Sequence, residues 1–322
     1  MRSTMLKLMS VVVLVTSLPM FAMVVDPTVA YWRFEEGPAD TQVPHGGLNG
    51  GQYYEGTADS SGNGYGLSVW DESGAGYRYR NDVGMTTVNG QANNFSVKNS
   101  GGGPAMWTAT ADGINSVAPA QFTIEASFKL ENGGYKTIVG RDSQGSNTAA
   151  GGDQARAALY FQAVPDNGLA IKFCDVSGYW YEAISAPNAY VGFNWSDAAP
   201  DGDGTAPWYS MAGVSDGSTL SLYLRNVTAN GGWQLIAQTP LNQGSPDTAL
   251  TAGTGDGGDW DAGNWTVGRG LWNGGHGDRA YGFIDEVRIS AAALTPDQFL
   301  IPEPATMILL GLGAMGLLKR RS

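Results

Sequence analysis

The chain of 322 residues is acidic, with a formal net charge of −12; glycine accounts for 47 of its residues, and only 15% are charged. This composition disfavours long helices and suits short strands joined by tight turns. The negative charge argues against binding to nucleic acids, which requires basic patches, so we expect no nucleic-acid partner.

Residues 1–22 have the layout of a secretory signal peptide. Arg2 and Lys7 precede an apolar stretch (8–18), and small residues follow around Ala22. The apolar stretch is too short to span a bilayer as a helix. We therefore predict that the export machinery takes up the chain and that signal peptidase cuts near Ala22. An uncleaved N-terminal anchor is the alternative.

Apolar residues between positions 26 and 300 recur with a period of two, which is typical of β-strands. In QFTIEASFKL (121–130) apolar and polar side chains alternate throughout, so we expect one face of this strand in the core and the other in solvent. VSDGSTLSLYLRNV (214–227) predicts a hairpin with its turn at Asp216-Gly217. Further strands are expected at 29–37, 157–164, 168–174, 233–238, 264–270 and 281–290, and a short helix at 293–300.

No change in composition and no internal repeat divides residues 26–300, so we expect a single domain. Many antiparallel strands separated by long Gly- and Asp-rich loops predict an all-β fold, a two-sheet antiparallel sandwich. Cys174 is the only cysteine, which excludes an intrachain disulfide. We expect its thiol to be buried and structural.

Several segments resemble the LamG-like jelly-roll family, whose fold is that of concanavalin A-like lectins and glucanases. They occur in the order of the family and extend over most of 29–295: YWRFEEG (31–37), DSSGNG (59–64), FTIEASFKL (122–130), WYSMAGVSDGSTLSLYLRN (208–226), and GFIDEVRIS (282–290) with the following ALT. The resemblance implies a jelly-roll β-sandwich over residues 26–300. The sequence ends on either side predict the flanking parts, a signal peptide before it and a short hydrophobic helix after it.

A structural Ca²⁺ site is a known theme of this family, and the resemblance implies one here. Asp285 continues the apolar series of strand 281–290, Glu36 continues that of strand 29–37, and the first and last strands of a jelly roll are commonly neighbours. A carboxylate on an apolar face is costly unless it is paired or bound to metal. Ca²⁺ binds six to eight oxygens, so we predict Glu36, Asp59, Asn63 and Asp285 as ligands. Alternatively, Asp285 pairs with an arginine or caps backbone N–H groups, and Glu36 is exposed.

Clustered aromatic residues suggest a carbohydrate site. Trp180 lies in GYWYEA (178–183), and Trp260 and Trp272 flank a Gly-rich region. Their rings could stack on sugars, although most tryptophans of a sandwich belong to its core. The ligand-binding prediction therefore names Trp180, Trp260 and Trp272.

Catalytic residues are not evident in the sequence. His45 and His276 are the only histidines and lie far apart, which disfavours a His-based triad or a zinc site. Retaining glycoside hydrolysis needs two carboxyl groups about 5–5.5 Å apart. No expected strand carries such a pair, so we predict a protein that is not an enzyme, with a glycoside hydrolase as the less favoured alternative.

The C-terminus combines Pro302-Glu303-Pro304, an apolar run (305–318) and the basic end Lys319-Arg320-Arg321. As a helix the run would be about 21 Å long, short of the roughly 30 Å hydrocarbon core of a bilayer. The basic end orients the segment, because such clusters stay cytoplasmic. An ordinary C-terminal membrane tail is the alternative to the interpretation that follows.

This tripartite end resembles the PEP-CTERM sorting signal of exosortase-processed proteins in Gram-negative bacteria. The resemblance implies transient insertion in the inner membrane, cleavage near Pro302-Glu303-Pro304 by an exosortase, and delivery to the cell surface or extracellular matrix. We accordingly predict an exported, non-catalytic LamG-like protein that binds carbohydrate or another surface polymer. A structural or adhesive matrix component without a specific ligand is the alternative.

Overall fold

A computed structural model describes most of the region between the two ends of the chain. The predicted signal peptide (1–22), Trp260 and the tail 302–322 lie outside the described residues, as do the tail's predicted helix and Lys319, Arg320 and Arg321. The described residues are 26–44, 55–70, 76–99, 101, 103–108, 113–149, 155–194, 206–253 and 263–301.

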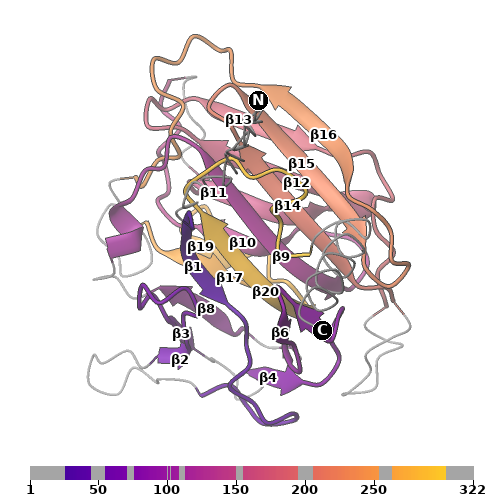
Figure 1. The fold of residues 1–322 in the computed structure, drawn as a ribbon. Coiled ribbons are helices and arrows are strands. Elements are labelled where there is room, and N and C mark those ends of the chain that lie inside the picture. The colour runs from indigo at the N-terminus through magenta and orange to yellow at the C-terminus, as the bar shows by residue number, and fades with distance from the viewer. Residues whose placement is uncertain are drawn as a thin grey trace, which may run out of the picture.

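Two antiparallel sheets form the body of the protein (Figure 1). The first sheet has the order β16 (Gln234–Pro240), β15 (Thr219–Asn226), β14 (Tyr209–Ser215), β9 (Phe122–Leu130), β20 (Gly282–Ser290), β7 (Ser96–Asn99) and β4 (Tyr77–Arg80), and β1 (Thr28–Trp32) also pairs with β20. The second has the order β13 (Trp180–Ile184), β12 (Gly168–Cys174), β11 (Leu159–Val164), β10 (Lys136–Arg141), β17 (Trp265–Val267), β8 (Ala105–Thr108), β3 (Leu67–Trp70) and β2 (Glu55–Thr57).

Short elements complete the fold. The hairpins are β18 (Gly270–Trp272) with β19 (Gly275–Gly277) and β5 (Thr87–Val88) with β6 (Gln91–Ala92), and the 3₁₀ turns are η1 (Gly113–Ser116) and η2 (Pro165–Asn167). The predicted all-β, two-sheet antiparallel sandwich is confirmed. So is the β14–β15 hairpin, and each further segment predicted as a strand contains one. None of the helices in the described part of the chain is both long and apolar enough for a membrane span.

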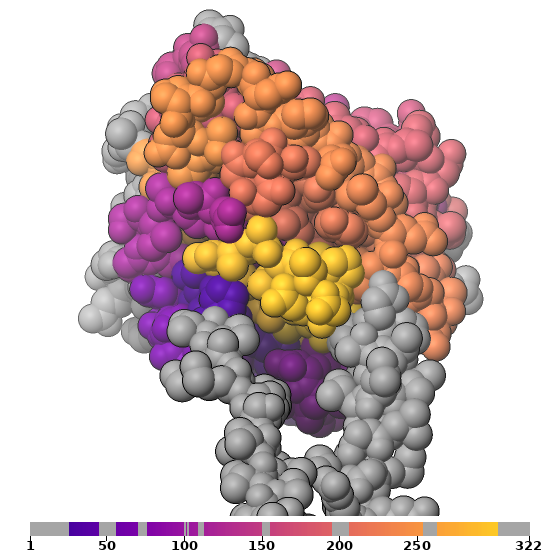
Figure 2. All heavy atoms as spheres, turned by 45° about the horizontal axis from the view of Figure 1, so that its top comes forward, coloured from indigo at the N-terminus to yellow at the C-terminus, as the bar shows by residue number. Residues whose placement is uncertain are grey.

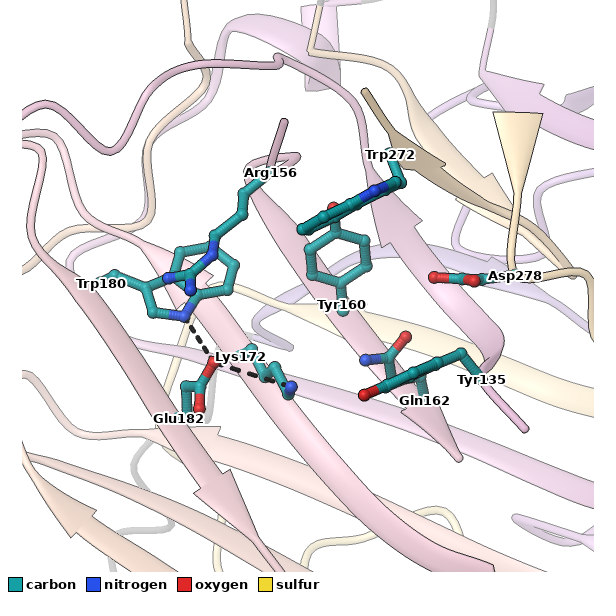
Figure 3. Close-up of a pocket in the computed structure, with 9 residues that line it drawn as sticks. All are labelled: Tyr135, Arg156, Tyr160, Gln162, Lys172, Trp180, Glu182, Trp272 and Asp278. Atoms are coloured by element: carbon teal, nitrogen blue, oxygen red, sulfur yellow. Dashed lines mark hydrogen bonds and ion pairs between the residues drawn. The ribbon is translucent and has the colours of Figure 1, made fainter. Parts of the chain in front are cut away.

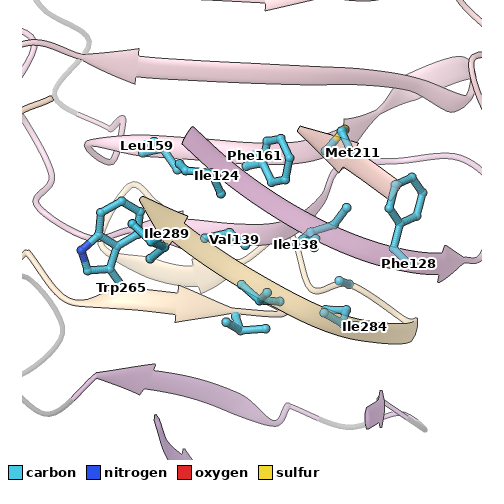
Figure 4. Packing of buried hydrophobic residues seen from close by; sticks show 14 of the residues in the cluster. Ile124, Phe128, Ile138, Val139, Leu159, Phe161, Met211, Trp265, Ile284 and Ile289 are labelled. Carbon is cyan, nitrogen blue, oxygen red and sulfur yellow. The ribbon is translucent and has the colours of Figure 1, made fainter. Parts of the chain in front are cut away.

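The core lies between the two sheets and is built from the inward-facing residues of both. Ile124 and Phe128 of β9 face Phe161 of β11 and Trp265 of β17 across this space (Figure 4). All four side chains are buried, as is Cys174, where burial raises the pKa of the thiol to about 12. The predicted buried thiol is therefore confirmed, and hydrophobic burial is the main source of stability.

The prediction that one face of β9 is exposed to solvent is wrong, because every residue of the strand is buried. Residues 292–301 return across the outer face of the first sheet, where Leu294 and Phe299 pack on Ala212 and Val214 of β14. The same segment forms part of the yellow surface in Figure 2. It is not the helix predicted at 293–300: it contains a turn, and its apolar side chains cover the sheet.

Polar residues on this covered face are paired. Glu125 of β9 binds the guanidinium of Arg288, with 2.6 Å between Arg288 Nε and Glu125 Oε2. Lys129 forms an ion pair with Asp82, and the Ser127 and Ser210 hydroxyls are 2.7 Å apart. Pairing is what makes burial of these groups tolerable, and it explains how a polar face can be covered.

A β-bulge in β20 changes which residues share a face. The register against β9 shifts between Asp285 and Arg288, and Glu286 has a positive φ of 51°. Ile284 pairs with Phe128 and faces the core, whereas Asp285 pairs with Ser127 and faces the covered outer side. The prediction that Phe283, Asp285, Val287 and Ile289 share one face is therefore wrong, because the extra residue of the bulge reverses the alternation.

The first strand is shorter than predicted but has the expected neighbour. β1 pairs with β20, with Ala30 opposite Ile289. Phe34 has a positive φ of 59°, so the strand ends before Glu36, which lies in the following turn. Ala30, Trp32 and Phe34 nevertheless reach the core.

A buried ion pair beside the second sheet, just after the ends of β10 and β17, provides a test of the fold. Arg269 donates two hydrogen bonds to Asp142, of 3.0 and 2.7 Å, and both side chains are almost completely buried. Asp142→Asn leaves the guanidinium without its counter-charge, so we expect a loss of about 3–5 kcal/mol in the free energy of unfolding, measured by urea denaturation. Asp40→Asn is the control, because Asp40 pairs with Arg80 but its side chain is 74% exposed; it should cost under about 1 kcal/mol. Equal losses of unfolding free energy in the two variants would contradict the conclusion that the buried Arg269–Asp142 pair stabilises the fold.

Candidate ligand-binding groove

The outer face of the second sheet carries a cluster of polar and aromatic side chains. In β11, Leu159 and Phe161 face the core, so Tyr160 and Gln162 point outward. The same alternation in β12 and β13 points Lys172, Trp180 and Glu182 outward. Alternation therefore places side chains from three neighbouring strands on one surface.

The β18–β19 hairpin borders this surface. The Tyr160 hydroxyl donates a hydrogen bond of 2.6 Å to the carbonyl of Leu271 and accepts one of 2.8 Å from the amide of Ala157. Leu271 also packs against Ala157 and Tyr160. The hairpin is thereby fixed to the sheet with Trp272 beside the outward-facing residues.

Together these elements enclose a hollow of about 430 Å³ (Figure 3). Its lining residues are Tyr135, Arg156, Tyr160, Gln162, Lys172, Trp180, Glu182, Trp272 and Asp278. A second hollow of about 410 Å³ shares Tyr135 and Asp278 with the first and extends past His276, Arg279 and Tyr281. We call the two hollows together the groove.

Two aromatic side chains of the groove are exposed. Trp272 is 47% exposed and Tyr135 is 50% exposed. In Figure 3 their rings lie on the hairpin side of the hollow, away from Trp180. Exposed aromatic rings beside hydrogen-bonding groups are typical of small-molecule sites, so these two residues are the strongest candidates for contact with a ligand.

Trp180 is more engaged within the protein than Trp272. Its Nε1 donates a hydrogen bond of 2.7 Å to Glu182 Oε1, and the Arg156 guanidinium lies 5.0 Å from the centre of its ring. Lys172 Nζ is 3.6 Å from Glu182 Oε1. Trp180 therefore organises one wall of the hollow through cation–π contact and hydrogen bonding.

Sequence reasoning found only part of the groove. Trp180 and Trp272 both line the first hollow, as predicted for a shared site, whereas Trp260 lies outside the described residues. The contribution of Tyr135, Arg156 and the β11–β12 side chains was missed. The outward positions of segments 157–164 and 168–174 carried the only available signal, namely tyrosine, glutamine and lysine between buried apolar residues.

The predicted calcium ligands take part in hydrogen bonds within the protein, and Ser61 links Asp59 with Asn63. Glu36 Oε1 accepts hydrogen bonds of 2.8 Å from the Thr57 hydroxyl and the Ala58 amide, and Glu36 Oε2 accepts one of 3.3 Å from the Tyr79 hydroxyl. Asp59 accepts hydrogen bonds from the amides of Tyr31 and Tyr65 and from Ser61. These carboxylates therefore hold loops to strands.

Asn63 and Asp285 also have hydrogen-bond partners within the protein. The Asn63 side chain donates to the carbonyls of Thr28 and Val29, at 3.2 and 3.0 Å. Asp285 Oδ2 accepts a hydrogen bond of 2.8 Å from Asn93, and burial followed by the charge of Glu286 raises the pKa of Asp285 well above its usual range. Within the described ranges, no three His, Cys, Asp or Glu residues form a group that could hold a metal ion. The calcium site stays a prediction.

The end of the chain matches a known motif: residues 300–322 fit the PEP-CTERM protein-sorting motif. This motif indicates an exported, cell-surface-directed protein that is processed by an exosortase. The prediction made from Pro302, Glu303 and Pro304 is thus confirmed at the level of the motif. No curated protein sequence matches the chain.

Solved structures show similarity to the sandwich. The binding domain of botulinum neurotoxin serotype D matches with a TM-score of 0.46 and 12% identity, over 88% of this chain and 51% of that one. Domain 4 of AbnA, a GH43 extracellular arabinanase from Geobacillus stearothermophilus, in complex with arabinotriose, matches with a TM-score of 0.45 and 15% identity, over 84% of this chain and 95% of that one. The Ruminococcus gnavus IT-sialidase CBM40 bound to alpha2,3 sialyllactose matches with a TM-score of 0.39 and 14% identity, over 58% of this chain and 83% of that one. The chain spans about half the length of the neurotoxin domains, and these similarities concern the fold alone.

The electrostatics of the groove generate a prediction about pH. Burial, with the charges of Arg269 and Arg279, lowers the pKa of His276 to about 3. The unfolded chain takes up a proton on this imidazole below about pH 6.5, so the stability that neutral His276 provides is complete above that pH and lost as the pH falls towards 3. We expect His276→Gln to lose less free energy of unfolding on acidification than the wild type does. The difference in slope should be under about 1 kcal/mol per pH unit, because the ring is partly exposed. Denaturant unfolding at several pH values measures this, and identical slopes would contradict it.

Proposed function

We propose that the groove binds carbohydrate and that the protein is a non-catalytic, LamG-like binding protein of the bacterial cell surface or extracellular matrix. The observation that carries the proposal is the pair of exposed rings, Tyr135 and Trp272, beside buried and half-buried polar side chains in one hollow. The sorting motif supports a location at which surface polymers are available.

Sugars suit this combination of side chains. A pyranose ring has apolar C–H faces and a rim of hydroxyl groups, so it can stack on an aromatic ring while its hydroxyls form hydrogen bonds. Gln162, Lys172, Glu182 and Asp278 supply both donors and acceptors around the hollow. Burial raises the pKa of Asp278 above its usual range.

A polymer fits the groove better than a single sugar. The two hollows share Tyr135 and Asp278, and their volumes are similar, at about 430 and 410 Å³. A chain of sugars could therefore continue from one hollow past Tyr135 into the other. We propose a surface polysaccharide of the exporting, Gram-negative cell or of its surroundings as the ligand.

A non-catalytic role is part of the proposal. Glu182, one of the two carboxylates in the first hollow, accepts the Trp180 Nε1 hydrogen bond and lies beside Lys172. These contacts engage the Glu182 carboxylate with neighbouring protein side chains, which does not suit a general acid. Hydrolysis of a polysaccharide by the purified protein would support the glycoside hydrolase alternative instead.

Replacement of Trp272 tests the binding site. We expect Trp272→Ala to weaken binding to a polysaccharide and glycan array at least about tenfold, or about 1.4 kcal/mol, because it removes an exposed stacking surface. The measurement uses the exported protein and titration of each polysaccharide that the wild type retains.

Leu235→Ala is the matched control for this experiment. Leu235 is 50% exposed, as Trp272 nearly is, but lies in β16 of the other sheet. It should leave affinity unchanged. An array that binds no wild-type protein would favour the structural or adhesive alternative, and equal effects of the two variants would show that the site lies elsewhere.

Tyr135 tests the extension of the groove. For oligosaccharides of increasing length cut from a polysaccharide that binds, we expect wild-type affinity to rise until both hollows are filled. Tyr135→Ala should flatten this dependence, because it removes the ring shared by the two hollows. Isothermal titration measures the series, and a length dependence that persists in the variant would contradict the continuous groove.

A further inference from the structure

The sandwich holds the first two residues of the sorting motif. The motif begins at Leu300, and both Leu300 and Ile301 are buried, with 5% and 3% exposure. Their side chains pack with Trp208, Val227 and other residues on the outer face of the first sheet. Motif residues that must be read by an enzyme are expected to be accessible, and these two are not.

Hydrogen bonds between side chains of the first sheet's outer face and the backbone fix the same two residues. The Leu300 amide donates to Glu125 Oε1 at 2.7 Å. The Ile301 carbonyl accepts from Arg225 Nη1 at 3.1 Å and from Trp233 Nε1 at 2.8 Å. We call Glu125, Arg225 and Trp233 the clamp.

The clamp is itself built into the fold. Glu125 and Arg225 are 3% and 2% exposed, and Glu125 is also bound by Arg288. The Trp233 ring packs edge-on against Phe299, with 4.9 Å between ring centres. Releasing Leu300 and Ile301 would break hydrogen bonds of buried polar groups and expose apolar surface, both of which are costly.

We propose that Leu300 and Ile301 belong to the folded domain rather than to the signal that the exosortase reads, and that the clamp sets the boundary of the mature chain. The processing enzyme then recognises only residues beyond Ile301 and cuts among or after Pro302, Glu303 and Pro304. The mature protein keeps its covered outer face.

The spacing in the sequence gives this boundary a geometric consequence. Only Pro302, Glu303 and Pro304 separate Ile301 from the apolar run (305–318), and three extended residues span at most about 11 Å. While the run is inserted in the membrane, the outer face of the first sheet is held within about that distance of the bilayer. The enzyme must therefore work next to the folded sandwich.

A Gly-Ser spacer inserted between Ile301 and Pro302 tests the proposal in a host strain that processes the wild type. We expect processing to continue at the same bond of the motif, with an unchanged melting temperature, because the clamp and the enzyme's signal lie on opposite sides of the spacer. Mass spectrometry of the mature C-terminus is the readout. Loss of processing, or a wild-type C-terminus before Ile301, would overturn the proposal.

Clamp variants separate folding from recognition. Trp233→Phe removes the Nε1 donor but keeps an aromatic ring against Phe299, so we expect a lower melting temperature with processing at the same bond. Ile301→Ser should lower the melting temperature further, by about 5 °C or more, again with an unchanged cleavage position. If Ile301→Ser stays as stable as the wild type but is no longer processed, the enzyme reads Ile301 and the proposal fails. These outcomes do not depend on carbohydrate binding.

Discussion

The pairing of β9 with β20 is the constraint on which the rest of the structure depends, because both strands are buried on both faces. Inward, Ile124 and Ile289 pair and contribute to the core between the sheets. On the outer side, Glu125 pairs with Arg288 and accepts a hydrogen bond from the Leu300 amide. One antiparallel pair therefore joins the core, the first strand and the end of the domain.

The bulge at Glu286 reconciles this pairing with the charges of β20. Without an extra residue, the alternation that places Val287 and Ile289 in the core would also place Asp285 there. The bulge turns Asp285 outward, to Asn93, and brings Glu286 to Arg33, with 3.0 Å between Arg33 Nη2 and Glu286 Oε1. Strict alternation could not have predicted this, since a bulge is set by contacts across strands and not by the local pattern.

Sequence patterns predicted the strands well and the environment of their faces poorly. QFTIEASFKL identified β9 to within one residue, but its polar residues, including Glu125 and Lys129, gave no sign of the segment that covers them. Their partners are remote in sequence: the Leu300 amide donates to Glu125, and Asp82 pairs with Lys129. The groove shows the same limit: Trp180 and Trp272 are conspicuous in the sequence, whereas the hollow between them depends on the position of the β18–β19 hairpin.

The groove and the clamp lie on opposite outer faces of the sandwich. Ile301 lies on the outer face of the first sheet, and Trp272 and Tyr135 lie on the outer face of the second. If the protein is attached through its C-terminal end, as the proposed function implies, the groove faces away from the point of attachment. This arrangement requires the clamp: if the last residues of the domain were loose, the sandwich could turn freely, and the direction of the groove would not be determined by the point of attachment.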